Sequence, residues 1–296
     1  MSAEALPDLS IVEAAVCEAV RRKDATGLRI LGHGEISIVL GWPADQPVHA
    51  LKRVPPFRSR ALAEQYVGVV EHNLHLLRAA NVPVWPTELH ITERADGSAV
   101  VYHRQPVADS TQLGTNVLRS AEPSSDHPLL VAIVRHAAAV VAPGVGFDVQ
   151  AANWIWDGTD AHQLDFTSPF LLDHTGKDLR FDTSGFLSEY PALLRPVLKR
   201  ELLKVIVRYT TAEGAIGDMV ANLHKEGLDA WMDPAIEAAR RDAGAVIDRG
   251  AATKMFEDDK KLMPLTLKLK KGQRWWVTHT GRRYETLLPE RTTYDR

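Results

Sequence analysis

The segment 146–158, GFDVQAANWIWDG, decides how this chain is interpreted. It follows a long apolar stretch, places Asp148 and Asn153 five residues apart, and then turns into the strand-like sequence WIW. A second segment, HQLDFTSPF at 162–170, puts another acid, Asp165, after a short apolar approach. None of the three polar residues lies in a run of charges, where solvated side chains gather. We therefore interpret them together as a candidate site.

Each of these three residues also has an ordinary structural explanation. Asp148 could cap a turn, Asn153 could satisfy loop carbonyls, and Asp165 could be an acid at the end of a strand. A catalytic interpretation requires partners elsewhere in the chain, so the rest of the sequence has to supply them.

Composition narrows the class of protein. With 296 residues, the chain is long enough for one large two-part domain or two ordinary ones. Its net charge of -3 argues against a globally basic nucleic-acid binder. The single cysteine, Cys17, cannot form an intramolecular disulfide, which indicates a reducing compartment.

The N-terminus and the longest apolar run indicate a soluble, cytoplasmic protein. The first sixteen residues carry acids and no basic region ahead of an apolar core, so they do not resemble a secretory signal. The longest apolar run, 129–147, is interrupted by Arg135, His136 and Pro143, which disfavours a membrane span. We expect no membrane partner.

The hydrophobic pattern changes character near residue 105. Before it, helical spacing predicts helices and alternation predicts strands in this order: helix 9–23, strands within 28–42 and 47–54, helix 60–80, strands within 82–92 and 98–105. After it, apolar faces predict helices over 127–141, 186–212 and 215–248. Only the WIW and QLDF segments interrupt them. The tail around Lys271-Gly272 alternates and is basic, which favours a terminal hairpin.

Two motifs in the first hundred residues fit phosphate binding. In LGHGEISIV at 31–39, Gly32 and Gly34 let the backbone turn tightly and approach phosphate oxygens, although Ser37 stands where a third glycine would be. A plain hairpin turn explains this motif equally well. Lys52 follows Gly34 by eighteen residues on a predicted strand, where a lysine is often only a solvated edge charge. Ala50 lies two residues before Lys52 on the same strand face.

The order of these motifs resembles the protein-kinase-like superfamily, and especially its aminoglycoside phosphotransferase-like branch. The resemblance covers residues 28–175 by motif, and the chain also looks like a bacterial family of kinase-fold proteins with no assigned substrate. It implies an α+β, bilobal protein-kinase-like fold. A small antiparallel-sheet N-terminal lobe with one helix would span 1–104, and a larger, mainly helical C-terminal lobe with the catalytic loop would span 105–296.

The resemblance also implies roles for the site residues. Asp148 would orient or deprotonate an acceptor hydroxyl, while Asn153 and Asp165 would supply oxygens to Mg²⁺ between the phosphates. Lys52 would pair with the α and β phosphates. A glutamate on the helix 60–80 would hold Lys52. Glu71 is preferred and Glu64 is the alternative, and either could also be a surface residue.

An ATP pocket is implied between the two lobes. Leu31 and Val39 would form its roof, Ile155 its floor, and the segment 102–106 a hinge whose backbone hydrogen-bonds the base. The residues expected to contact the nucleotide are Leu31, Gly32, Gly34, Val39, Ala50, Lys52, His103, Gln105 and Ile155.

Three departures from the kinase pattern bear on the substrate. Gly146 stands where a histidine usually precedes the catalytic acid, Thr167 stands where a glycine usually follows Asp-Phe, and no Ala-Pro-Glu segment follows. The missing segment argues against a kinase that docks peptides, although a peptide acceptor stays open.

We therefore expect a phosphotransferase that uses ATP and Mg²⁺ to phosphorylate a hydroxyl of a small molecule, an antibiotic or a metabolite. The alternative is a kinase-fold scaffold that binds a nucleotide or a partner with little turnover. Nucleic acid is not an expected partner.

Overall fold

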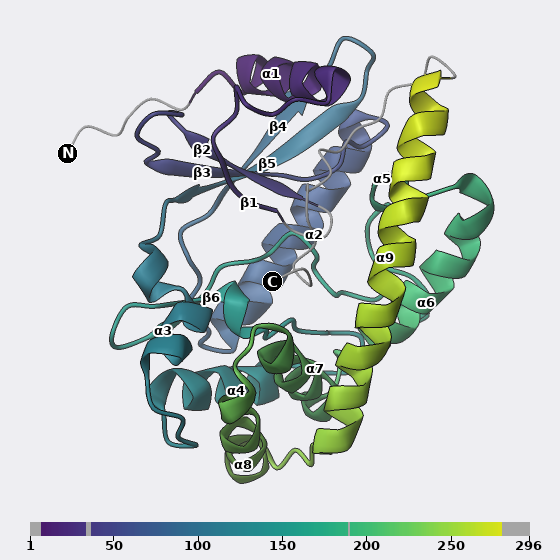
Figure 1. The fold of residues 1–296 in the computed structure, drawn as a ribbon. Coiled ribbons are helices and arrows are strands. Elements are labelled where there is room, and N and C mark those ends of the chain that lie inside the picture. The colour runs from purple at the N-terminus through teal and green to yellow at the C-terminus, as the bar shows by residue number, and fades with distance from the viewer. Residues whose placement is uncertain (1–6, 34–36, 189, 280–296) are drawn as a thin grey trace.

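The computed structural model describes residues 7–33, 37–188 and 190–279 (Figure 1). The fold is α+β, with an antiparallel sheet followed by a mainly helical part, as the sequence predicts. We call residues 7–106 the sheet part and residues 107–279 the helical part. The predicted lobe boundary after residue 104 stays a prediction; the last strand of the sheet ends at Pro106.

The sheet part contains one five-stranded antiparallel sheet. Its strands are β1 (Ile30–His33), β2 (Ile38–Trp42), β3 (His49–Arg53), β4 (Glu88–Glu93) and β5 (Ala99–Pro106), in the order β1-β2-β3-β5-β4. Strand β3 lies at the centre, with Lys52 opposite Val39 on one side and opposite His103 on the other.

Alternation along β3 sends neighbouring side chains to opposite faces of the sheet. Leu51 belongs to a small core with helix α1, and Arg53 reaches a glutamate of that helix. Lys52, between them, reaches an acid of the helical part. Two buried polar clusters therefore form on the two faces of one strand.

Helix α1 (Leu9–Arg22) covers the sheet on the side away from the helical part (Figure 1). The Asp8 side chain caps its first turn by accepting from the amide of Ser10 at 2.9 Å, and apolar residues at helical spacing face the sheet. The prediction of a helix over 9–23 is confirmed. The sequence did not predict that Glu13, on the same face, is buried with 3% exposure.

Helix α2 (Arg60–Ala79) packs on the other face, against β4 and β5. Ser59 caps it, and its buried residues include Ala63, Tyr66 and Val70, which share one side of the helix. These side chains join the main core, which continues into the helical part. The predicted helix over 60–80 is confirmed.

The helical part contains a two-stranded hairpin, β6 (Trp154–Trp156) and β7 (Ala161–Gln163), among helices. The helices are α3 (Gly114–Ser120), α4 (Pro128–Val140), α5 (Ser184–Leu187), α6 (Arg195–Arg208), α7 (Ala212–Lys225), α8 (Met232–Ala243) and α9 (Arg249–His279), with four short 3-10 turns, η1 (Ser110–Gln112), η2 (Ala151–Asn153), η3 (Ala192–Leu194) and η4 (Asp229–Trp231). No helix of the described ranges is both long and apolar enough to cross a membrane.

Two predicted long helices are each divided in the structure. The helix expected over 186–212 is broken before α6, where Pro191 precedes a 3-10 turn and Pro196 stands in the first turn of α6. The helix expected over 215–248 is broken between α7 and α8, where Gly227 adopts a φ of 68°. Helix α3 was not predicted, because it is only seven residues long.

The predicted basic C-terminal hairpin is wrong. Residues Arg249–His279 form one helix, α9, that packs against α7 and α8 and runs along one side of the molecule (Figure 1). Ala252 and Phe256 are buried four residues apart, and so are Gln273 and Val277, which is the spacing of a packed helix face. That spacing outweighs the short alternation around Lys271. The part of the tail beyond residue 279 lies outside the described residues.

Candidate functional site

The loop that carries Asp148 is fixed by backbone contacts on both sides. The amide of Gly146 donates to the carbonyl of Phe170 at 2.8 Å, and the amide of Phe147 donates to the carbonyl of Tyr209 at 3.1 Å. A Cβ at position 146 would lie 2.9 Å from the Cβ of Phe170. Glycine is therefore required here by close packing, which gives the departure from the kinase histidine a local cause.

Asp148 itself is half-buried beside a second acid, Asp218 of α7. The Asp148 carboxylate accepts from the amide of Gln150 at 3.1 Å. The Asp218 carboxylate accepts from the side-chain amides of Gln150 at 3.0 Å and Asn222 at 2.9 Å. Burial, and then the charges of Asp148 and Asp218, raise the pKa of the Tyr209 phenol, so it keeps its proton. Two acids and three neutral polar side chains thus share this end of the site.

Sequence reasoning missed Asp218. The signal was present, because this acid interrupts the apolar face of α7 in AIGDMVANL and is only 7% exposed. A buried acid on an otherwise apolar helix face needs hydrogen-bond partners. The amides of Gln150 and Asn222 could not be assigned to it before the loop and the helix were placed together.

The structure brings Asn153 next to the segment that holds Asp165. Asn153 ends η2, and its carbonyl accepts from the amide of Leu164 at 2.8 Å. Asp165 is the next residue along the chain. The β6–β7 hairpin therefore brings the segments that carry Asp148, Asn153 and Asp165 close together.

Gln163, at the end of β7, joins the two acidic loops directly. Its side-chain amide donates to the carbonyl of Asp148 at 3.2 Å and to the carbonyl of Asp165 at 3.2 Å. Its own backbone pairs with the sheet part, through hydrogen bonds with Pro83 and Trp85 at 2.8 Å each. This buried glutamine was not predicted as part of the site, because nothing in the sequence marks which carbonyls its side chain meets.

Lys52 and Asp165 form an ion pair between the sheet part and the helical part. The Lys52 Nζ lies 2.5 Å from Asp165 Oδ2, and the other carboxylate oxygen accepts from Thr167 N at 2.9 Å and Thr167 Oγ1 at 2.7 Å. Burial alone would raise the pKa of Asp165, but the Lys52 charge and these hydrogen bonds lower it to about 2. Asp165 is therefore ionised at neutral pH.

The predicted pairing of Lys52 with a glutamate of α2 is wrong. Glu71 is exposed, and Glu64 is exposed and pairs with Arg60 at 2.8 Å. The reason is the rotation of the helix, whose buried face carries Tyr66. Glu71 follows Tyr66 by five residues, which places it about 140° around the helix axis. Within the described ranges, Lys52 pairs instead with Asp165.

The predicted hinge overlaps the end of strand β5. Residues 102–106 all pair with β3, and 102–104 also pair with β4. The hinge is therefore wrong for 102–104, whose backbone is used by the sheet on both sides, and stays a prediction for Gln105 and Pro106. Two side chains of this segment link the two parts: Gln105 donates to the carbonyl of Leu164 at 2.8 Å, and His103 is fully buried against α2.

The other residues predicted to contact the nucleotide differ in position and in exposure to solvent. Leu31 and Gly32 lie in β1, Val39 lies in β2 opposite Lys52, and Leu31 is 38% exposed. Ala50 lies opposite Gln105. Gly34 is outside the described residues. Ile155 is completely buried in β6, so it offers no surface to a ligand and the prediction that it forms a pocket floor is not supported.

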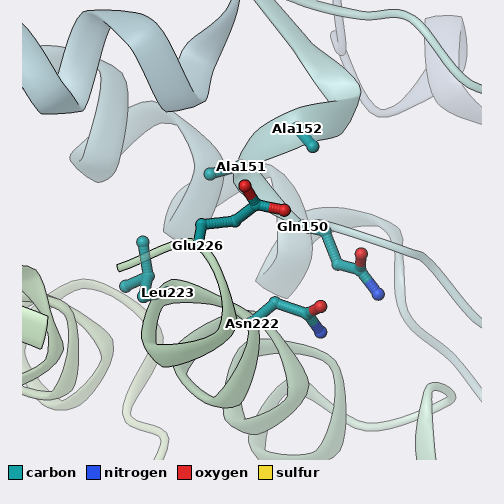
Figure 2. A pocket seen from close by; sticks show the side chains of 6 residues that line it. All are labelled: Gln150, Ala151, Ala152, Asn222, Leu223 and Glu226. Carbon is teal, nitrogen blue, oxygen red and sulfur yellow. The ribbon is translucent and has the colours of Figure 1, made fainter. Parts of the chain in front are cut away.

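A small pocket lies beside the Asp148 loop (Figure 2). It is lined by Gln150, Ala151, Ala152, Asn222, Leu223 and Glu226. In Figure 2, Glu226 extends from the end of α7 toward the loop, and the side chains of Gln150 and Asn222 lie on the same side of the pocket. This small hollow lies next to the Asp148 loop, because Gln150 is two residues from Asp148 and its backbone amide donates to that carboxylate.

The oxygen donors of the site suit Mg²⁺ with a bound nucleotide. No group of three or more His, Cys, Asp or Glu side chains that could hold a metal occurs within the described ranges. Mg²⁺ is usually held by one or two protein oxygen ligands together with phosphates and waters. The ionised Asp165 is one such oxygen ligand, and the backbone carbonyl of Asn153 is hydrogen-bonded to Leu164, the residue before it.

The chain belongs to a family described as "Family of unknown function (DUF6206)", whose model matches residues 12–268. The sequence matches no curated protein. Among solved structures it is similar to the crystal structure of a point mutant of the Mycobacterium tuberculosis PknI kinase domain, at 16% sequence identity, with a TM-score of 0.31 and coverage of 74% of this chain and 96% of that one. A TM-score this low does not assign a function.

Proposed function

We propose that this member of the DUF6206 family is a kinase-like phosphotransferase that uses ATP and Mg²⁺ to phosphorylate a hydroxyl of a small molecule. The observation that carries the proposal is the 2.5 Å ion pair between Lys52 and Asp165, formed across the sheet part and the helical part. The loop with Asp148 and Asn153 is bonded to the Asp165 segment through Gln163 and Leu164. Phosphoryl transfer requires such a gathering of one cation and several oxygen donors.

Within this proposal the cationic side chain and the oxygen-bearing side chains have different roles. Lys52 binds phosphate oxygens, and Asp165 with Asn153 holds Mg²⁺. When bound, the ion neutralises charge on the phosphates. Lys52 and Asp165 are already paired, so the nucleotide meets a cation whose position is fixed by burial and by the sheet.

Asp148 is the residue proposed to act on the acceptor. The acceptor oxygen attacks the γ-phosphorus, the bond to the β-phosphate oxygen breaks, and the hydroxyl proton passes to the Asp148 carboxylate. Small-molecule hydroxyl compounds are the proposed class, because the peptide-docking Ala-Pro-Glu segment is missing from the sequence.

Nucleotide binding is tested by thermal shift with ATP and Mg²⁺ on the wild type, Asp165→Ala and Glu71→Ala. The wild type and the exposed-carboxylate control Glu71→Ala are expected to be stabilised by Mg²⁺ with ATP, whereas Asp165→Ala is not. Equal stabilisation of all three proteins would contradict the role of Asp165. GTP in place of ATP tests the base.

A scaffold with little turnover is the second candidate. The exposure of Glu71 favours it, because the catalytic lysine of a kinase is normally held by a helix glutamate. A scaffold would bind nucleotide without consuming it when offered a panel of hydroxyl acceptors.

A further inference from the structure

A chain of buried polar groups connects Asp165 to helix α2 through a tyrosine. Asp165 Oδ1 accepts two hydrogen bonds from Thr167. The carbonyl of Thr167 accepts from Tyr66 Oη at 3.0 Å, and Tyr66 Oη lies 2.9 Å from His103 Nε2. The chain thus begins at the proposed metal ligand, passes through α2, and ends on strand β5 opposite Lys52.

The hydrogen-bond donors in this chain can be assigned by counting protons. The phenol has a single hydrogen, which goes to the Thr167 carbonyl because that oxygen can only accept. His103 Nε2 must then donate to Tyr66 Oη, which leaves Nδ1 as an unprotonated acceptor. Burial, and then the charge of Lys52, lower the pKa of His103 to about 3, so the imidazole is neutral. Its Nδ1 is buried with no hydrogen-bond partner among the described residues.

The phenol of Tyr66 is held by aromatic packing as well as by hydrogen bonds. Its ring has no exposure to solvent and lies 5.0 Å from the ring of Phe57 and 5.3 Å from that of Phe181. A hydroxyl enclosed in this way is costly to bury without partners. Burial, and then the charge of Asp165, raise the pKa of Tyr66, so the phenol stays protonated and remains a donor.

We infer that Tyr66, supported by His103, is a positioning residue: its hydroxyl fixes the Thr167 segment and so aims the carboxylate of Asp165 at Lys52, whereas the expected α2 glutamate would have held Lys52 directly. Tyr66 occupies the buried face of α2 that looks onto the Asp165 segment, whereas Glu71 faces away. The role toward Lys52 and Asp165 stands on the contacts themselves. Its meaning for catalysis rests on the proposed function.

The choice of a phenol changes the electrostatics of the site. A glutamate at this position would add a negative charge beside Asp165 and compete with it for Lys52. A neutral hydroxyl ties α2 to the segment after Asp165 and leaves that carboxylate as the anion facing Lys52. The geometry of the Lys52–Asp165 ion pair should therefore depend on the single buried hydroxyl group of Tyr66.

The test compares two tyrosine variants on opposite faces of the sheet. Tyr66→Phe removes the hydroxyl that contacts Thr167, and Tyr102→Phe removes a buried hydroxyl that donates to Glu13 at 2.6 Å on the α1 side. Each protein is treated with an N-hydroxysuccinimide ester, and acylation of Lys52 is quantified by peptide mass spectrometry. Binding of ATP with Mg²⁺ is measured in parallel.

We expect Tyr66→Phe to raise the rate of Lys52 acylation at least severalfold and to weaken binding of ATP with Mg²⁺ about tenfold, with Tyr102→Phe unchanged in both. Faster acylation in Tyr66→Phe, when no protein binds nucleotide, would support the positioning role and contradict the proposed function. Unchanged acylation in folded Tyr66→Phe, or an equal increase in both variants, would overturn the inference. If Tyr66→Phe does not fold, His103→Leu removes the supporting donor, and unchanged acylation there overturns it as well.

Discussion

Two buried polar clusters lie on the two faces of strand β3, and they differ in how completely their groups are paired. On the α1 face, the Glu13 carboxylate accepts from Arg53 at 2.7 and 2.9 Å, from Arg94 at 2.8 Å and from Tyr102 at 2.6 Å. Its oxygens are saturated by charged and phenolic donors. We call this the structural cluster.

On the other face, Lys52, Asp165, Thr167, Tyr66 and His103 form what we call the site cluster. Here Asp165 Oδ2 pairs with Lys52, and His103 Nδ1 has no partner among the described residues. Hydrogen-bonding capacity therefore remains on this face. The comparison teaches that burial of charge alone does not mark a functional site. The site cluster differs from the structural cluster in keeping an acceptor that is unused among the described residues, His103 Nδ1, beside its ion pair.

The largest expected effect is on turnover. Asp148→Asn removes the proton acceptor while keeping the shape of the side chain, so we expect ATP consumption with an accepted substrate to fall by about 10²–10⁴-fold. The melting temperature should change little. Steady-state ATP consumption measures the turnover, and thermal unfolding measures the melting temperature. Undiminished turnover would remove Asp148 from the mechanism.

Breaking the structural cluster should cost stability but not nucleotide binding. Glu13→Gln leaves two buried guanidinium groups without their anion, and we expect a loss of about 3–5 kcal/mol in the free energy of unfolding. Urea denaturation measures it. Glu18→Gln, which removes an exposed carboxylate paired with Arg21 on the same helix, is the control and should change the free energy little. Equal effects of the two variants would contradict the distinction.

The structural cluster should also make stability depend on pH. Burial alone would raise the pKa of Glu13, but Arg53 and Arg94 lower it from 4.5 to about 2 in the folded protein. A depressed pKa contributes stability that is fully present above pH 4.5 and is lost as the pH falls toward 2, by about 3 kcal/mol. Urea unfolding across this range should show that loss, and Glu13→Gln should flatten this part of the curve. A curve unchanged by the substitution would contradict the pairing.

The bridge between the acidic loops should contribute less. Gln163→Leu removes two hydrogen bonds that join the carbonyls of Asp148 and Asp165, and we expect a loss of about 1–3 kcal/mol of stability. Because these bonds hold the two loops together, binding of ATP with Mg²⁺ should weaken as well. Isothermal titration calorimetry measures the affinity of Gln163→Leu for ATP with Mg²⁺. An affinity equal to that of the wild type would contradict the proposal that Gln163 links the two loops.

Sequence reasoning went further with the fold than with the site. Periodicity located the elements up to β5 and helix α4, because packing on one face leaves a pattern along the chain. Periodicity failed in the tail. There, a short alternation around Lys271 predicted a hairpin, whereas the structure contains helix α9. The regular spacing of buried Phe256 and Ala252 became decisive only when α7 was in place beside them.

For the site, motif spacing identified Lys52, Asp148, Asn153 and Asp165, and the structure brings these residues into one region. It could not choose the side chain of α2 that faces them. The rotation of the helix decides whether a glutamate or a tyrosine points inward, and the buried face of α2 is set by its packing on β4 and β5.

The sequence by itself determined the order of elements up to β5 and supplied the acids, amide and lysine of the candidate site, because local periodicity and motif spacing are properties of the chain. Tertiary structure alone decided which of these groups meet: Tyr66 rather than Glu71 at the Asp165 segment, Gln163 between the two loops, and Asp218 beside Asp148. The physical reason is that a hydrogen bond or ion pair depends on distances of about 3 Å, and those distances arise only when separate elements pack.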